Sequence, residues 1–225
     1  MNRTVLKFLG IFTMLIDHIG VFLLEEGDLY LACRLIGRLA FPIFAFMIAQ
    51  GFLKTKQLKQ YVLRLGGFAL FVEGLFALRS LLFELPYTPL KDNVIVPLLF
   101  GLLVLICVKS TNDFYRLGLV GILIFTMFVS YPYTIYGLSM IAIFGLASKK
   151  WLQALLFMLI HLFFIQVPGI SFPFYIYPWQ QQFALLFLPL LFLYNGQKGR
   201  DYKALFYIFY PLHLILLWGI AFYIK

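Results

Sequence analysis

Two neighbouring ionisable residues, Asp17 and His18, lie inside an otherwise apolar stretch near the start of the chain, Phe8 to Leu24. An ionisable group in a membrane-spanning segment costs roughly 2.5 to 3.5 kcal/mol, so such residues are kept mainly where they act. Two arginines that could balance the carboxylate, Arg34 and Arg38, follow across one short acidic loop. This cluster is therefore the first place to look for function.

The residue types of this cluster suit acyl transfer. A histidine, whose pKa is ordinarily about 6.5, can take the proton of an attacking amine or hydroxyl. Arg34 and Arg38 are four residues apart and share a helix face, and arginine N–H groups can stabilise a developing oxyanion. Asp17 and His18 point about 100° apart around a helix axis. We expect Asp17 to pair with an arginine and His18 to face a cavity; the alternative for Asp17 is an ion pair that only fixes helix packing.

Two other histidines lie in apolar segments. His213 follows Tyr210 by three residues, which places both on one helix face, and Pro211 loosens the backbone between them. We take His213 and Tyr210 as further candidates for the site. His161 lies alone among Leu, Ile and Phe and is expected to be a hydrogen-bonded packing residue.

Glu73 is a polar residue without an obvious partner in its own segment. The simpler interpretation is an ion pair with Arg79 or Arg38, and the alternative is a catalytic carboxylate. We keep Glu73 among the candidate catalytic residues.

The densest positive patch consists of Lys54, Lys56, Lys59 and Arg64. Such a patch beside a membrane can mark topology and contact anionic lipids. The alternative is a binding site for a phosphorylated donor.

The composition indicates a membrane protein. Hydrophobic residues make up 63% of the 225 residues and charged residues only 12%. The charge-free runs 117–148, 152–197 and 204–224 are too long for a soluble protein of this size. The net charge of +9 then reflects topology rather than nucleic-acid binding.

We predict an all-α, polytopic membrane helical bundle that forms a single domain over residues 1–225. About nine transmembrane helices are expected, with the N-terminus in the cytoplasm, because that orientation places most of the 18 basic residues inside. Turns are expected at Tyr131–Pro132 and through Val167–Gly169, followed by an interfacial aromatic stretch, Phe172–Trp179. The predicted segments are Val5–Leu24, Leu35–Leu53, Tyr61–Phe83, Val94–Val108, Leu117–Ser130, Ile135–Ala147, Leu152–Gln166, Gln180–Tyr194 and Ala204–Ile224.

Distinctive motifs lie at both ends of the chain, in the stretches Thr13–Gly20, Ile36–Phe46, Gly51–Thr55, Lys59–Leu65, Tyr194–Gly196 and Phe206–Leu214. These motifs resemble the TraX family of membrane proteins. The family is named for N-terminal acetylation of conjugative pilin and is similar to multi-span acyltransferases. The resemblance implies an acyl-CoA-dependent transferase in a bacterial cytoplasmic membrane, and it carries over to Asp17, His18, Arg38, Tyr210 and His213, with Arg34 fitting less closely.

The expected function is transfer of an acetyl group from cytoplasmic acetyl-CoA to an amine or hydroxyl outside, on a peptide N-terminus or a glycan, without a metal. His18 would be the general base and His213 its partner or replacement. The alternative is a proton-coupled carrier in which Asp17, His18, Glu73 and His213 form a relay. A third possibility is a purely structural subunit.

Overall fold

The computed structural model describes residues 1–166, 177–200 and 202–224, and these residues are helical apart from their loops. An isolated bridge between Ile165 and Tyr177 is the β-type pairing recorded in the described part of the chain. The predicted all-α class is confirmed. The chain divides into two compact units, which we call unit 1 (Met1–Met47 with Lys149–Lys225) and unit 2 (Ile48–Ser148).

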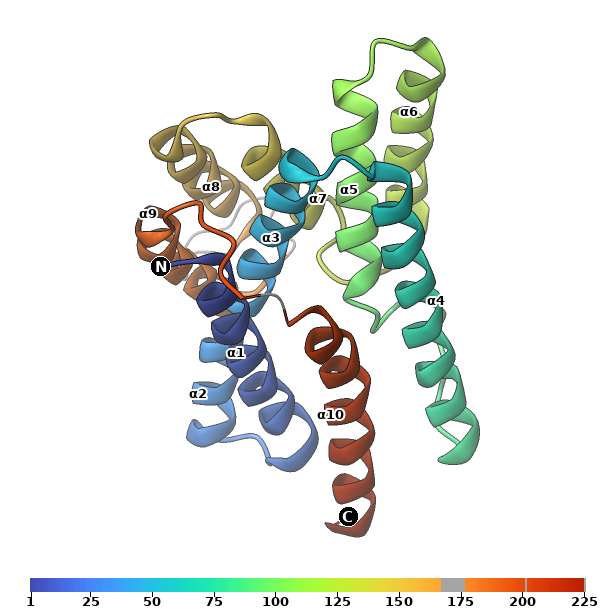
Figure 1. The fold of residues 1–225 in the computed structure, drawn as a ribbon. Coiled ribbons are helices and arrows are strands. Elements are labelled where there is room, and N and C mark those ends of the chain that lie inside the picture. Colours follow the sequence, from blue (N-terminus) through green and yellow to red (C-terminus); the bar gives the residue numbers. More distant parts are fainter. Residues whose placement is uncertain (167–176, 201, 225) are drawn as a thin grey trace. The chain divides into compact units, whose positions relative to one another are not determined.

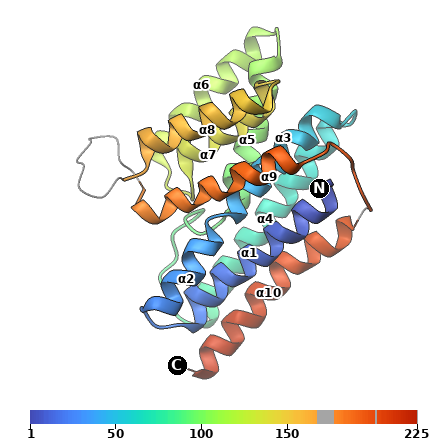
Figure 2. The same ribbon diagram turned by 90° about the vertical axis from the view of Figure 1, so that its left-hand side faces the viewer.

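Unit 1 contains the two ends of the chain. Helix α1 lies between α2 and α10 and packs against both, as Figures 1 and 2 show. The short helix η1 also contacts α2, α8 and α9. The elements of unit 1 are α1 (Arg3–Leu23), α2 (Asp28–Gly37), the first part of α3 (Ala40–Lys54), α8 (Lys150–Phe164), the 3₁₀ helix η1 (Trp179–Leu186), α9 (Phe187–Leu193) and α10 (Lys203–Ile224).

Unit 2 is built around α5, which packs against α4, α6 and α7. Glycines permit the closest of these contacts: a Cβ atom at Gly101 would lie 2.2 Å from Ile141, and one at Gly145 would lie 2.5 Å from Leu105. Small residues at a helix interface let two backbones approach in this way. The elements are the remainder of α3, α4 (Leu58–Leu82), α5 (Ile95–Lys109), α6 (Asp113–Phe128) and α7 (Thr134–Leu146).

Among the residues that the structure describes, four helical segments are long and apolar enough to cross a membrane: Arg3–Leu23, Asp28–Lys54, Leu58–Leu82 and Ala204–Ile224. Each of the other predicted segments also contains a helix, but these helices are shorter. Those of 13 to 15 residues, such as α7 and α5, span about 20 Å, less than a typical hydrocarbon core. The number of crossings and the cytoplasmic side of the N-terminus stay predictions.

Two predicted segments differ in detail from the structure. The segment predicted at Leu35–Leu53 begins earlier, at Asp28, and breaks into α2 and α3 at Arg38–Leu39. Pro42 accounts for this break, because it has no N–H to bond the carbonyl group of Arg38 and its ring crowds that carbonyl. The segment predicted at Gln180–Tyr194 starts as the 3₁₀ helix η1 before it becomes α9. The predicted turn at Val167–Gly169 and the aromatic stretch up to residue 176 lie outside the described residues.

Candidate active site

The candidate site begins where α1 and α2 approach each other closely. A Cβ atom at Gly37 would lie 2.2 Å from the Asp17 carboxylate, and one at Gly20 would lie 2.8 Å from Cβ of Cys33. No larger residue fits at Gly37 without moving Asp17. These two glycines therefore bring the carboxylate of α1 within reach of the arginines at the end of α2.

Asp17 binds both arginines. Its Oδ2 lies 2.8 Å from Nη1 of Arg34, and its Oδ1 accepts a hydrogen bond of 3.0 Å from Nη2 of Arg38. The expectation that Asp17 pairs with an arginine is thus met twice. One negative and two positive charges leave this cluster with a surplus of one positive charge.

The two arginines are used differently. Arg38 also donates through Nε to the carbonyl group of Arg34 at 3.1 Å and through Nη1 to Oε1 of Gln181 at 3.2 Å, so all three of its nitrogens are engaged. Within the described residues, the guanidinium group of Arg34 makes its one polar contact to Asp17, through Nη1, and the Arg34 side chain is 26% exposed against 15% for Arg38. Arg38 is a fixed part of the framework, whereas Nε and Nη2 of Arg34 are open donors.

His18 meets His213 across the α1–α10 interface. Nδ1 of His18 lies 2.7 Å from Nε2 of His213, and the two ring planes are 6° from parallel with their centroids 5.0 Å apart. The nitrogens are closer than two stacked rings can approach, so the rings lie edge to edge in nearly one plane. This is the geometry of an N–H···N hydrogen bond.

The direction of that hydrogen bond follows from the next partner. Nδ1 of His213 lies 2.8 Å from the carbonyl oxygen of Phe209, which can only accept. In a neutral pair, Nδ1 of His213 therefore carries the proton, its Nε2 accepts, and Nδ1 of His18 donates. The lone pair is left on Nε2 of His18, which has no hydrogen-bond partner in the described part of the chain.

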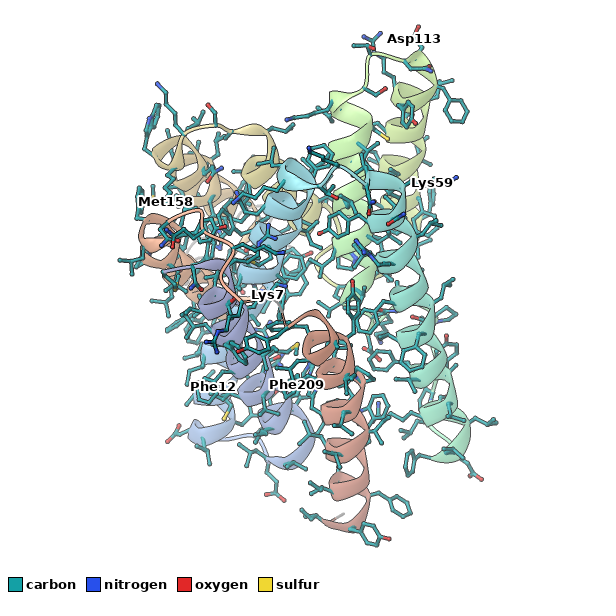
Figure 3. All side chains as sticks on the ribbon, viewed as in Figure 1. Lys7, Phe12, Lys59, Asp113, Met158 and Phe209 are labelled. Carbon is teal, nitrogen blue, oxygen red and sulfur yellow. The ribbon has the colours of Figure 1, made fainter. Side chains whose placement is uncertain are left out.

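Aromatic rings surround the histidine pair. Phe209 is parallel to His213 with centroids 4.9 Å apart, and Tyr210 meets His213 edge-on at 5.5 Å. Phe22 packs against His18 at 5.8 Å and against Trp218 at 6.3 Å. His213 is 4% exposed. The histidine pair thus packs against aromatic rings, one of which, Phe209 on α10, is labelled in Figure 3.

Comparison with known proteins identifies the family. The family model described as "TraX protein" matches residues 2–221 of the chain. The chain belongs to the TraX family. A curated relative, the "Probable fimbrial assembly protein FimC, serogroup H1" of Dichelobacter nodosus, is 25% identical over 243 aligned positions, which cover 94% of this chain and 92% of the relative. No solved structure matches this TraX protein.

The other predicted site residues of this TraX protein belong to unit 2. Lys54, Lys56, Lys59 and Arg64 are exposed around the turn from α3 to α4, and Figure 3 shows Lys59 at the start of α4. Their role as a phosphate site stays a prediction.

Glu73, also in unit 2, accepts three hydrogen bonds from the loop between α4 and α5 and its end. The donors are the hydroxyl of Tyr87 at 2.7 Å and the N–H of Leu90 at 2.8 Å, both to Oε1, and Nδ2 of Asn93 at 2.9 Å to Oε2. Sequence reasoning did not suggest these partners. They make Glu73 the anchor of a loop.

His161 is in unit 1, on helix α8. It is 3% exposed, and its Nδ1 lies 2.7 Å from the carbonyl oxygen of Phe157, one turn earlier on α8. This agrees with the expected packing role. Among the described residues, no group of three or more His, Cys, Asp or Glu side chains could hold a metal ion.

Sequence reasoning missed Gln181. This residue of η1 is 2% exposed and supplies the acceptor for Arg38. The signal was available, because Gln180, Gln181 and Gln182 follow one another inside a segment predicted to cross the membrane.

Proposed function

We propose that this TraX-family protein is a membrane acyltransferase that moves an acetyl group from cytoplasmic acetyl-CoA to an amine or hydroxyl on the extracytoplasmic side of a bacterial cell membrane. The observation that carries the proposal is the aligned pair His18–His213, which leaves one basic nitrogen open beside a positively charged cluster. His18 follows Asp17 directly on α1, and Asp17 binds both arginines. Base and cation are the two groups that acyl transfer needs.

The reaction can be written with these residues. Nε2 of His18 takes the proton of the acceptor, whose nitrogen or oxygen attacks the thioester carbonyl. The carbonyl oxygen becomes an oxyanion, which the open N–H groups of Arg34 stabilise. Collapse of this intermediate breaks the carbon–sulfur bond, and the CoA thiolate takes the proton back from His18. Tyr210 is a further candidate donor through its hydroxyl.

His213 has a positioning role in this scheme. Its Nε2 is occupied by His18 and its Nδ1 by Phe209, so it has no free lone pair of its own. It fixes the tautomer of His18 and can share the charge when His18 is protonated. A backbone carbonyl that orients a histidine through its second nitrogen has the same effect in other catalytic sites.

The name of the curated relative supports one class of acceptor. The FimC protein is named for fimbrial assembly. That name favours the N-terminal amine of a pilin-like peptide over a glycan hydroxyl as the acceptor. The acceptor would reach the site from the extracytoplasmic side of the membrane.

The basic patch of unit 2 is proposed to hold the phosphates of CoA. Replacing Lys56 and Lys59 together by Gln should raise KM for acetyl-CoA and reduce its dependence on salt, because phosphate contacts are screened by ions. Folded yield should stay close to wild type, since both side chains are exposed. An unchanged KM would indicate that this patch only sets the topology and contacts anionic lipids.

The experiment that tests the function uses the purified protein in neutral-lipid nanodiscs with acetyl-CoA labelled in the acetyl group. Wild type should release CoA, and a peptide with a free N-terminus should speed the release and gain the label. His18→Ala should remove both effects, whereas His161→Gln, the matched control on α8, should keep them in proportion to folded protein. No label transfer to any amine or hydroxyl acceptor would overturn the proposal.

A second candidate function is a proton-coupled carrier, because a histidine pair joined by one N–H···N bond can also pass a proton. In that case no acyl-CoA should bind, and uptake of a solute into proteoliposomes should stop when the proton gradient is collapsed. Binding of acetyl-CoA separates the two functions.

A further inference from the structure

The orientation of the Gln181 amide is fixed by its neighbour. Arginine has donors only, so the atom that faces Nη1 of Arg38 at 3.2 Å must be the oxygen, Oε1. The nitrogen, Nε2, is therefore the other end of the amide. It is buried and has no hydrogen-bond partner in the part of the chain that the structure describes.

A buried N–H group without an acceptor is unusual. It costs about 1 to 3 kcal/mol, and the great majority of buried polar groups in proteins are paired. Of the two adjacent glutamines, Gln182 donates through Nε2 to the carbonyl group of Gln166 at 2.9 Å, whereas Oε1 of Gln180 is also buried without a hydrogen-bond partner among the described residues. The described residues supply no acceptor for Nε2 of Gln181, which leaves room for a bound group in that place.

The backbone of η1 holds Gln181 in this place. The 3₁₀ helix runs for eight residues, Trp179–Leu186, although such helices rarely exceed three or four residues. It packs against α2, the helix that carries Arg34 and ends directly before Arg38. This conformation keeps Gln181 buried against Arg38.

The cluster of Asp17, Arg34 and Arg38 also has too few hydrogen-bond acceptors. Both oxygens of Asp17 are already bonded to arginines, Arg34 keeps open N–H groups, and the cluster carries a surplus positive charge. Donors exceed acceptors here. The group that completes the cluster is therefore an oxygen that carries negative charge, at least when the reaction is under way.

We propose that Gln181 is a further catalytic residue of the transfer site, whose Nε2 donates a hydrogen bond to the carbonyl oxygen of the bound thioester while Oε1 holds Arg38. This inference rests on the proposed acyltransferase function. Together with Arg34, the amide gives two different donors to the oxyanion. Because Nε2 is shielded from water, its hydrogen bond to that oxygen is stronger than it would be in solvent.

The test separates the two ends of the amide. Gln181→Glu keeps an oxygen for Arg38 but removes the donor, whereas Gln181→Met removes both. Loss of one such donor should lower kcat by roughly 10² to 10³. We expect both variants to show this loss while KM for acetyl-CoA stays within a few-fold of wild type. Gln182→Glu, on the next residue, is the matched control and should keep its kcat.

If Gln181 only positions Arg38, Gln181→Glu should stay active and Gln181→Met should not, which would overturn the proposal. If Gln181→Glu does not fold, a binding measurement provides a second test. Wild type should bind acetyl-CoA more tightly than S-ethyl-CoA, which lacks the carbonyl oxygen, by roughly 2- to 10-fold. Gln181→Met should lose this preference. A preference that survives in Gln181→Met would contradict the role of Nε2.

Failure of this inference can be told apart from failure of the proposed function. If wild type transfers acetyl groups and His18→Ala does not, but Gln181→Glu matches wild type, only the role of Gln181 is wrong. If wild type transfers nothing and binds both CoA compounds equally, the acyltransferase function and the role of Gln181 fail together.

Discussion

The polar clusters of the two units differ in whether their hydrogen bonds are complete. In unit 2, Glu73 accepts from three donors, and Asn93, which is 0% exposed, donates to both Glu73 and the carbonyl group of Ala69 and accepts from the N–H of Ile95. In unit 1, Nε2 of His18 and Nε2 of Gln181 have no partner among the described residues.

This difference separates a structural from a functional polar group. Both clusters lie beside apolar helices, where polar groups are costly. The Glu73 cluster recovers that cost within the chain, because its hydrogen bonds tie α4 to the loop that follows it. The cluster at His18 does not, and its open groups are a lone pair and several N–H donors. A substrate that offers a proton and a carbonyl oxygen would complete it.

The largest effect is expected at His18. His18→Ala should lower kcat by roughly 10² to 10⁴, the usual contribution of a general base, with donor binding close to wild type. His213→Ala should lose less, because the basic atom survives and only its orientation is lost. Single-turnover transfer from labelled acetyl-CoA measures both. If His213→Ala abolished transfer while His18→Ala kept it, the base would lie on α10 instead.

Asp17 should matter more for folding than any other residue of the site. Asp17→Asn leaves two arginines without their counter-charge, and breaking a buried pair in this way costs on the order of 3 kcal/mol. The measurement is unfolding in detergent, followed by circular dichroism. Asp113→Asn is the matched control: its pair with Arg116 has side chains 84% and 70% exposed, and exposed pairs contribute about 0 to 1 kcal/mol. Equal effects of the two substitutions would contradict a structural role for the Asp17 cluster.

The sequence was enough to predict the helices and the Asp17 pairing. Apolar runs bounded by charged residues or by turn residues mark a helix in every predicted segment, and the four-residue spacing of Arg34 and Arg38 puts both on one face. The sequence analysis could name His213 as a partner of His18 but could not predict their direct contact, because the two residues are 195 positions apart. Nothing local in α1 specifies which residue of α10 lies opposite.

The missed features depend on backbone detail. The helix break at Arg38–Leu39 follows from Pro42, and the hydropathy of the segment does not reveal it. The partners of Glu73 come from a loop in which Glu84 and Leu90 adopt positive φ values of 52° and 66°, a conformation that their residue types do not predict. Gln181 became a candidate only once η1 placed it against Arg38.

A substitution at Glu73 tests whether the cluster with complete hydrogen bonds in unit 2 is structural. Glu73→Gln replaces one acceptor oxygen by a donor that faces other donors, so the variant should lose about 1 to 3 kcal/mol of stability. Transfer per folded molecule should stay near wild type. Activity and unfolding are measured on the same preparation, with Glu84→Gln as the control in the neighbouring loop. A large loss of kcat at unchanged stability would restore Glu73 as a catalytic carboxylate or as part of a proton relay.

The smallest expected effect is the alkaline response of Tyr87, which reports on the same cluster. The hydrogen bond to the Glu73 carboxylate, with burial and the charge of that carboxylate, raises the pKa of Tyr87 to about 12. An unfolded tyrosine has a pKa of about 10. The folded protein therefore keeps a proton that the unfolded chain loses, so the contribution of Tyr87 to stability is complete below about pH 10 and disappears as the pH rises to about 12.

Tyr87 is 41% exposed, so solvent weakens this contribution. The measurement is the difference in unfolding stability between wild type and Tyr87→Phe at several pH values, which cancels the titration of the other tyrosines. The difference should shrink between pH 10 and 12 and should be small at every pH in a Glu73→Gln background. A difference that stays constant to pH 12 would show that Tyr87 does not donate to Glu73. Glu73 would then have two hydrogen-bond donors instead of three, and the contrast between its cluster and the His18 cluster would be weaker.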